Sequence, residues 1–121
     1  MEVLGALPSL HHDATRCRRP RRSVNFYDPF LGMATAVTRR ARQLEQPLHP
    51  EEALTREQVI RFYTINNARL LRCDEQLGSL EAGKLADLIV VDTDLLTCAE
   101  DRIATTRVQR TYVGGRMVYG R

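Results

Sequence analysis

The sequence predicts an α+β domain in which two helices are followed by a strand and a terminal β-hairpin. Three observations predict this class: a capped helical pattern over Thr55–Arg72, a short apolar run over Ala86–Val91, and a double glycine, Gly114-Gly115, between two β-prone segments. A chain of 121 residues is long enough for one domain. Apolar residues make up 43% of the chain and charged residues 27%, as in ordinary soluble proteins.

The first 25 residues are predicted to form an irregular, disordered basic arm, because they show no sustained helical or strand period. Five arginines fall within Arg16–Arg22, and without them the net charge of +3 becomes −2. Such a run can attract nucleic acid or an acidic membrane, but no aromatic residues interleave with it to stack on bases. We therefore expect neither a nucleic acid nor a membrane as a partner.

A first helix is predicted from Pro29 to Gln43. Pro29 suits the first turn, where its missing N–H removes no internal hydrogen bond, and Asp28 just before it can cap the helix. The prolines at positions 47 and 50 then indicate a loop over residues 44–50.

A second helix is predicted from Thr55 to Arg72. Thr55 and Gln58 form a capping-box pattern, in which each side chain can satisfy a backbone donor of the first turn. Helical spacing predicts one buried stripe, formed by Val59, Phe62, Tyr63, Asn66 and Leu70. Asn66 is the polar member of this stripe, and the simplest interpretation is a hydrogen bond to neighbouring backbone. Gly78 is the predicted stop of the helix.

The strand over Ala86–Val91 is predicted to be buried on at least one face, since β-branched residues fill its end and Asp92 stops it. Gly83 can take a positive φ at little cost, so the chain can reverse tightly before the strand.

The segments Val108–Val113 and Arg116–Tyr119 are predicted to pair as a hairpin. Consecutive glycines at the turn allow the positive φ values of a type I′ turn, whose twist suits antiparallel strands. This register pairs Tyr112 with Met117 and Thr111 with Val118, and it places Tyr112, Met117 and Tyr119 on one face.

The three cysteines, Cys17, Cys73 and Cys98, are odd in number and far apart in the chain. This spacing argues against a disulfide scaffold and suits a reducing cytoplasm. No apolar run approaches the roughly 20 residues that span a bilayer, and the N-terminus lacks the pattern of a secretory signal. A cytoplasmic location is therefore expected.

Four segments in a fixed order resemble a known family. They are DPFLGMATAVTRR (Asp28–Arg40), LTREQVIRFYTINNARLL (Leu54–Leu71), GSLEAGKLADLIVVD (Gly78–Asp92) and TYVGGRMVY (Thr111–Tyr119). By these segments, residues 26–121 resemble the C-terminal end of the metal-dependent amidohydrolase superfamily, in the branch called amidohydrolase family three. Relatives in this family hydrolyse non-peptide C–N bonds, such as amides.

The resemblance implies a larger fold than this chain can build. Full-length relatives hold one or two divalent metals, such as zinc, in a (β/α)₈ barrel of the TIM type beside a β-sandwich. Residues 29–72 of this chain would supply the last barrel helices, and residues 77–121 would supply sandwich strands. The expected fold class is therefore a C-terminal α+β fragment of a barrel-plus-sandwich amidohydrolase.

The metal ligands of that family do not carry over to this sequence. No H-x-H pair occurs, and the place of the family's Ser-Asp-x-Pro segment is filled by Arg21 and Arg22. His49 is alone in a loop, and the neighbouring His11 and His12 would point in different directions. No catalytic residue, metal ligand or cofactor is therefore expected in this chain.

The family residues that do match are expected to be structural, as turn glycines, strand entry and polar anchors. These residues are Gly78, Ser79, Gly83, Lys84, Ala86 and Asp87, and the two glycines of the hairpin turn, Gly114 and Gly115, join them.

Two functions are therefore open. The first is a truncated amidohydrolase, inactive alone, whose family resemblance begins abruptly after about Asn25. The second is a non-enzymatic α+β module that binds a partner through exposed strand edges, which present unpaired N–H and C=O groups. Possible partners are a second copy of the chain or the missing barrel portion.

Overall fold

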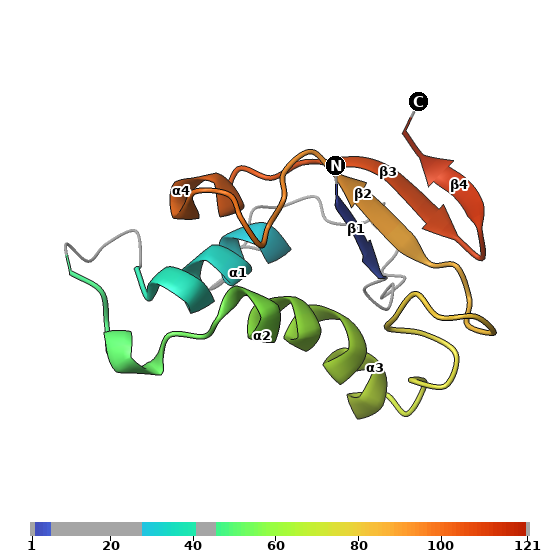
Figure 1. Ribbon diagram of the computed structural model, residues 1–121, viewed down its shortest axis with the longest axis horizontal. Helices are drawn as coiled ribbons and strands as arrows, with labels where there is room; N and C mark the ends of the chain where they lie inside the picture. Colours follow the sequence, from blue (N-terminus) through green and yellow to red (C-terminus); the bar gives the residue numbers. More distant parts are fainter. Residues whose placement is uncertain (1, 6–27, 41–45, 121) are drawn as a thin grey trace, which may run out of the picture.

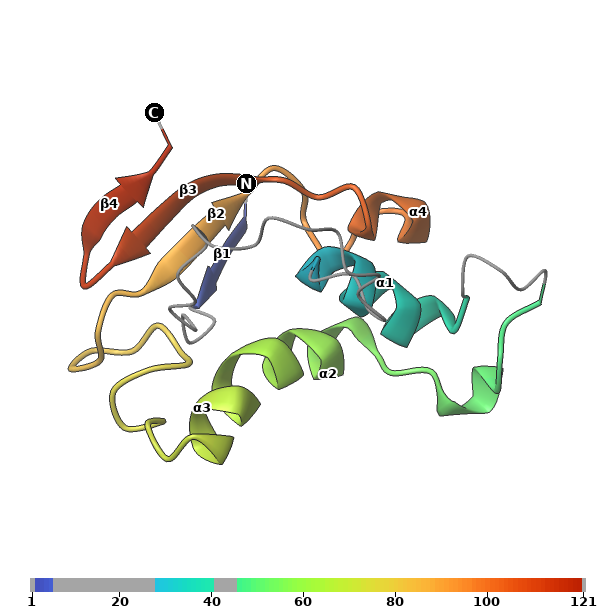
Figure 2. The same cartoon turned by 180° about the vertical axis from the view of Figure 1, so that it is seen from behind.

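The chain folds as a small α+β unit in which one sheet lies beside a group of short helices. The computed structural model describes residues 2–5, 28–40 and 46–120. The antiparallel sheet has the order β1-β2-β3-β4, with β1 at Glu2–Gly5, β2 at Leu88–Val91, β3 at Val108–Val113 and β4 at Arg116–Tyr119. Figures 1 and 2 show α1, α2 and α4 gathered on one side of the molecule, with β4 the strand farthest from them.

The helical elements are short, and several follow one another directly. They are α1 (Pro29–Thr38), the 3₁₀ turn η1 (Pro50–Glu52), α2 (Arg56–Arg61), the π-helical turn η2 (Phe62–Asn66), α3 (Asn67–Leu70) and α4 (Glu100–Ile103). No helix in the described ranges combines the length and the apolar character that crossing a membrane demands.

The prediction of an irregular arm over residues 1–25 is wrong for Glu2–Gly5. These residues form β1 and pair antiparallel with β2, from Glu2 opposite Val91 to Gly5 opposite Leu88. The pairing satisfies backbone groups on the side of β2 that β3 does not cover, which a sequence pattern for an isolated segment does not reveal. The Arg16–Arg22 run and the neighbouring His11 and His12 lie outside the described residues.

The first helix begins as predicted and ends early. Asp28 Oδ1 accepts hydrogen bonds from the N–H groups of Phe30 at 2.9 Å and Leu31 at 3.4 Å, which caps the helix. The helix stops at Thr38 instead of Gln43, because Arg39 takes a left-handed conformation with φ of 56°. The Thr38 hydroxyl donates to the Ala34 carbonyl at 2.7 Å, a local bond of the kind that bends or ends helices.

The second helix has the predicted start and an unpredicted π turn. Thr55 Oγ1 accepts from the Gln58 N–H at 3.2 Å, and the Thr55 N–H donates to Gln58 Oε1 at 2.8 Å, so the capping box is confirmed. The helical path then runs through α2, η2 and α3 to Leu70. Gly78 is not the stop, because the chain already leaves the helix at Arg72, whose φ is 57°.

The π turn changes which residues of this helix are buried. Val59 is 2% exposed as expected, and Tyr63 is half-buried and packs against the core. Phe62 is 55% and Leu70 79% exposed, and Asn66 is exposed too, so the predicted stripe is wrong at these three positions. Ala68 is fully buried instead. Ala68 lies nine positions after Val59, and an uninterrupted α-helix would place the two residues on opposite sides. The extra residue in the π turn rotates α3 enough to bring Ala68 inward.

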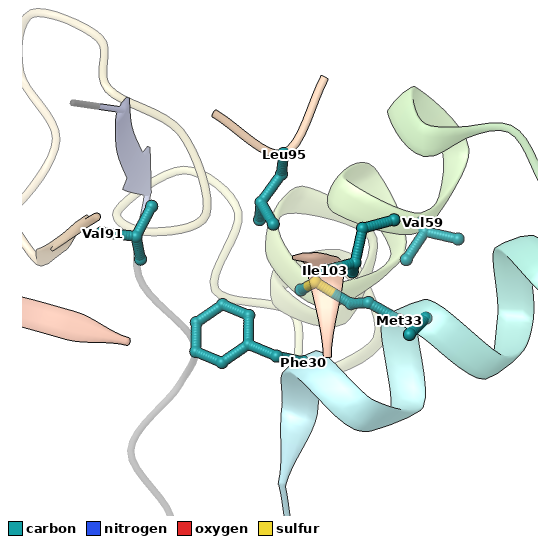
Figure 3. Packing of buried hydrophobic residues seen from close by; sticks show 7 residues of the cluster. Phe30, Met33, Val59, Val91, Leu95 and Ile103 are labelled. Carbon is teal, nitrogen blue, oxygen red and sulfur yellow. The ribbon is translucent and has the colours of Figure 1, made fainter. Parts of the chain in front are cut away.

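The core joins the helices to the end of β2. Its buried cluster comes from α1, α2, α4, β2 and the loop after β2, and consists of Phe30, Met33, Ala34, Val59, Val91, Leu95 and Ile103. Figure 3 shows these side chains converging, with the Phe30 ring between Val91 and the Met33–Ile103 pair. Burial of this apolar surface is the main force that holds the helical group against the sheet.

The terminal hairpin has the predicted bounds, and its register is right in part. Gly114 and Gly115 have φ of 55° and 78°, and Tyr112 pairs with Met117 as predicted. Thr111, however, pairs with Tyr119 because the register shifts at a bulge. Adjacent residues of β3 point to opposite faces, so Tyr119 does not share the face of Met117.

The strand before the hairpin starts at Leu88 instead of Ala86. The two residues ahead of it bond to the hairpin turn: the Ala86 carbonyl accepts from the Gly115 N–H at 2.9 Å, and Asp87 Oδ1 accepts from the Gly114 N–H at 2.6 Å. Ala86 and Asp87 therefore lie ahead of the strand and support the turn that joins β3 to β4.

Acidification is expected to weaken the junction between β2 and β3. Asp92 follows β2, and its Oδ1 accepts hydrogen bonds from the Arg107 N–H and the Thr93 hydroxyl, both at 2.9 Å. These bonds, the one from Arg107 above all, hold the pKa of Asp92 below its ordinary value of 3.8. A lowered folded-state pKa stabilises the fold above the unfolded-state pKa, and this contribution is lost as the pH falls through the folded-state value.

The Asp92→Asn variant tests this linkage, because it keeps a hydrogen-bond acceptor and removes the charge. We expect its thermal midpoint to lie below that of the unmodified chain at neutral pH. The gap should close as the pH falls below the ordinary aspartate pKa of 3.8. Thermal melts over this pH range measure it, and a gap of constant size would contradict the assignment.

Candidate functional site

A groove of about 670 Å³ lies beside the segment that carries the matched glycines. One wall comes from the second helix and the other from the loop between α3 and β2. The lining residues are Glu57, Ile60, Arg61, Thr64, Ile65, Arg69, Asp74, Gly78, Ser79, Leu80, Glu81, Lys84 and Leu96. Basic and acidic side chains are equally represented, so the groove has no strong net charge.

Lys84, Ser79 and Glu81 form a hydrogen-bonded cluster at the wall of this groove. Lys84 Nζ donates to Ser79 Oγ at 2.7 Å and lies 3.5 Å from Glu81 Oε1, and the Ser79 hydroxyl donates to the same oxygen at 2.5 Å. The Lys84 side chain is only 14% exposed. The cluster ties both ends of the turn together, because Ser79 precedes Gly83 and Lys84 follows it.

The chemistry of this cluster does not suit nucleophilic catalysis. The hydrogen bond from Ser79, followed by the charge of Lys84, holds the pKa of Glu81 below its usual range. A general base works best when its pKa lies near the working pH. Lowering the pKa of the Glu81 carboxylate moves it further from neutral pH and makes this group a poorer base. Ser79 therefore has a partner that orders it and no partner that activates it.

Gly78 and Gly83 both have positive φ, but only one of them is packed. A Cβ on Gly78 would lie 2.6 Å from the Ala68 Cβ and 2.9 Å from the Ile65 Cα. The loop thus approaches the helix as closely as a glycine allows, at the residues that the π turn presents. A Cβ on Gly83 would meet nothing within 4 Å, so this glycine serves only the turn conformation.

The eight matched residues fall into two groups in space. Gly78, Ser79 and Lys84 line the loop wall of the groove, and Gly83 lies in the turn between Ser79 and Lys84. Ala86 and Asp87 hold the hairpin turn through Gly114 and Gly115.

The described residues contain no set of three or more histidine, cysteine, aspartate or glutamate side chains that could hold a metal ion. His49 is exposed, and its Nδ1 lies 3.0 Å from Glu51 Oε1. A catalytic zinc needs three protein ligands around an open position, so these residues do not fit such a metal.

One contact of the helix was missed at the sequence level. The Arg56 guanidinium donates to the Leu95 carbonyl at 3.0 Å and to Cys98 Sγ at 3.5 Å, which joins α2 to the loop after β2. Arg56 is not part of the predicted buried stripe, and no local pattern indicates a partner about 40 residues away. The positions of Thr64 and Ile65 at the groove were also missed, because they depend on the π turn.

Comparison with known proteins identifies the family of this small α+β chain. The profile described as "Amidohydrolase family" matches residues 9–119. The chain belongs to the amidohydrolase family. The match begins well before residue 26, so the boundary that the sequence predicted for the family resemblance is too late.

The individual relatives agree with this assignment. The chain is 42% identical over 95 residues to the N-substituted formamide deformylase of Arthrobacter pascens, and 32% identical over 92 residues to Protein LONG AFTER FAR-RED 3 of Arabidopsis thaliana. These matches cover 78% and 76% of this chain but 17% and 16% of the relatives. The chain therefore spans about a sixth of the length of these relatives.

A solved amidohydrolase from Thermotoga maritima has a similar structure. The two share a TM-score of 0.53 and 26% sequence identity, over 77% of this chain and 19% of the other. The likeness thus extends to the fold of the matched segment.

Proposed function

We propose that this chain is the C-terminal structural segment of a metal-dependent amidohydrolase and does not hydrolyse substrates alone. Its helices would close the barrel and its strands would join the sandwich. The observation that carries this proposal is the coverage: a match to 78% of this chain takes up 17% of the deformylase. The absence of an H-x-H pair from all 121 residues supports it further.

The catalytic metal would be bound by residues of the longer relatives that have no counterpart in this sequence. In those relatives a divalent ion such as zinc would activate water for attack on a non-peptide C–N bond. The residues of this chain would contribute rigidity: the Lys84 cluster orders the loop, and the Asp87 contact orders the hairpin. The free thiols of Cys73 and Cys98 suit a reducing compartment such as the cytoplasm.

The alternative function, partner binding through exposed strand edges, has weaker support. The outer strand β4 has four exposed residues, but its pairing with β3 is interrupted by a bulge. Bulges twist an edge and interrupt the row of free backbone groups that strand addition needs.

The isolated chain is expected to show no hydrolysis of simple amides or N-formyl compounds when zinc or manganese is added. Three histidines without an H-x-H pair do not assemble a catalytic zinc site. Product formation is compared with that of the metal alone. Turnover above this blank that disappears with a chelator would overturn the proposal.

A chimaera supplies the positive arm of the same experiment. Residues 28–119 of this chain replace the matching segment of the Arthrobacter pascens deformylase. We expect the chimaera to keep deformylase activity, while the same enzyme without the segment loses it. If the chimaera melts like its parent but is inactive, the deformylase's own segment supplies reacting groups that this chain lacks. A chimaera that does not fold would contradict the structural equivalence.

A further inference from the structure

The strand β2 lies inside the sheet only because β1 covers one of its two edges. β3 pairs with the other edge, and β1 pairs antiparallel with β2 along the whole length of β2. β1 also contacts the π turn η2. Figure 1 shows β1 as the short blue strand beside β2. A segment of four residues thus keeps β2 from being an edge strand of the sheet.

The edge of β2 that β1 covers has no other protection against strand addition. Residues Leu88–Val91 are apolar and uncharged, and three of the four are β-branched, which is typical of segments that pair with other strands. Charged side chains and bulges commonly guard such edges. The bulge of β2 lies in its pairing with β3, and not with β1. The flanking carboxylates also bond on the β3 side. Asp87 accepts from the Gly114 N–H at 2.6 Å, beyond the end of β3. Asp92 accepts from the Arg107 N–H at 2.9 Å, just before β3.

We propose that β1 is an autoinhibitory strand, which keeps this edge of β2 closed to the same edge of a second copy of the chain. A two-fold contact uses one self-complementary patch twice, and antiparallel pairing of two identical edges has this symmetry. A two-fold axis at Ile89 pairs Leu88 of each copy with Val90 of the other. It also places Asp87 opposite Val91, so the carboxylates that flank β2 do not face each other as like charges.

The covalent link between β1 and the rest of the chain gives β1 the advantage over a second copy. Residues 6–27 join β1 to α1. A tethered partner acts at an effective concentration on the order of 1 mM, so it outcompetes a second copy that is present at micromolar concentration. The contact between copies therefore forms when the pairing of β1 is lost. This inference does not rest on the proposed hydrolase role, because it concerns only the edge of β2.

Substitution of Val3 and Leu4 by proline in the full chain tests the proposal. Of two consecutive residues in an antiparallel strand, one directs its N–H group to the neighbouring strand, so the double variant loses a hydrogen bond to β2. Sedimentation velocity over a micromolar concentration series measures association. We expect the Val3→Pro/Leu4→Pro variant to dimerise with a dissociation constant about tenfold or more below that of the unmodified chain.

The Val3→Thr/Leu4→Thr variant is the matched control, since threonine keeps both N–H groups and suits a strand. It should associate like the unmodified chain. Hydrogen exchange locates the contact: amides of Leu88–Val91 should lose protection in the proline variant at low concentration and regain it in the dimer. A proline variant that stays monomeric with β2 unprotected would overturn the proposal. So would a dimer in which β2 remains unprotected, or a threonine variant that dimerises as strongly as the proline variant.

A disulfide variant decides the question if the proline variant fails to fold. Val3 and Val90 are directly opposed across β1 and β2, at a separation that a disulfide can bridge. Val3→Cys/Val90→Cys is made in a chain whose three native cysteines are replaced by alanine. Oxidation should give an intramolecular bridge and slow amide exchange in Leu88–Val91 about tenfold or more, because β1 can then no longer leave the edge. Failure to form the bridge, or a bridge that does not slow this exchange, would show that β1 is not a removable cover.

Discussion

Substitution of Gly78 by alanine is expected to lower the free energy of unfolding by about 2–5 kcal/mol, from two separate causes. The φ of 89° costs a residue with a Cβ about 1–2 kcal/mol. The new methyl group would also overlap the Ala68 Cβ and the Ile65 Cα, at 2.6 and 2.9 Å. Overpacking of this kind typically costs about 1–3 kcal/mol, and the backbone position of one contact prevents easy relief.

Gly83→Ala separates these causes. Gly83 has a similar φ of 93°, but a Cβ there meets nothing within 4 Å. We expect it to cost only the conformational part, about 1–2 kcal/mol. Urea denaturation of both variants, followed by far-UV circular dichroism, gives the comparison. If Gly78→Ala were no more destabilising than Gly83→Ala, the close approach of the loop to the helix would be disproved.

The elements that the sequence predicted well are those whose signals are local. The Asp28 cap, the Thr55–Gln58 capping box and the double-glycine turn each depend on side-chain and backbone groups within four residues. Such chemistry is present in the sequence itself, so the starts of both helices and the bounds of the hairpin were predicted correctly.

The elements that were missed depend on distant contacts. The π turn spans Phe62–Asn66. Gly78, which lies beyond the end of the helix, packs on Ile65 in this turn and on Ala68 just after it. Periodicity assumes an uninterrupted α-helix and therefore placed Leu70 inside. The strand β1 forms only because β2, more than 80 residues away, offers it an edge.

The candidate site was predicted as a set of residues but not as a geometry. The family resemblance selected Ser79 and Lys84, yet nothing in the sequence indicates that Ser79 links Lys84 to Glu81. Asp87 was predicted to be a polar anchor, and its partner, the Gly114 N–H, lies 27 residues further along the chain. Such pairings require the sheet to be assembled first.

A large effect on stability is also expected at Leu95, in the loop after β2. This residue is 2% exposed and belongs to the cluster that joins the helices to β2. Leu95→Ala is expected to lower the free energy of unfolding by about 2–5 kcal/mol, from lost apolar transfer energy and the cavity left behind. Whole domains are stable by only about 5–15 kcal/mol, so this single change removes a large share of the total.

Leu96→Ala is the control, because it makes the same chemical change one residue further on. Leu96 is 45% exposed and lines the groove, so its truncation should cost less than about 1 kcal/mol. Urea unfolding curves of the two variants should therefore differ clearly in midpoint, with similar slopes. Equal midpoints would mean that Leu95 is not enclosed by the core, and that the helical group and the sheet are not held together by this cluster.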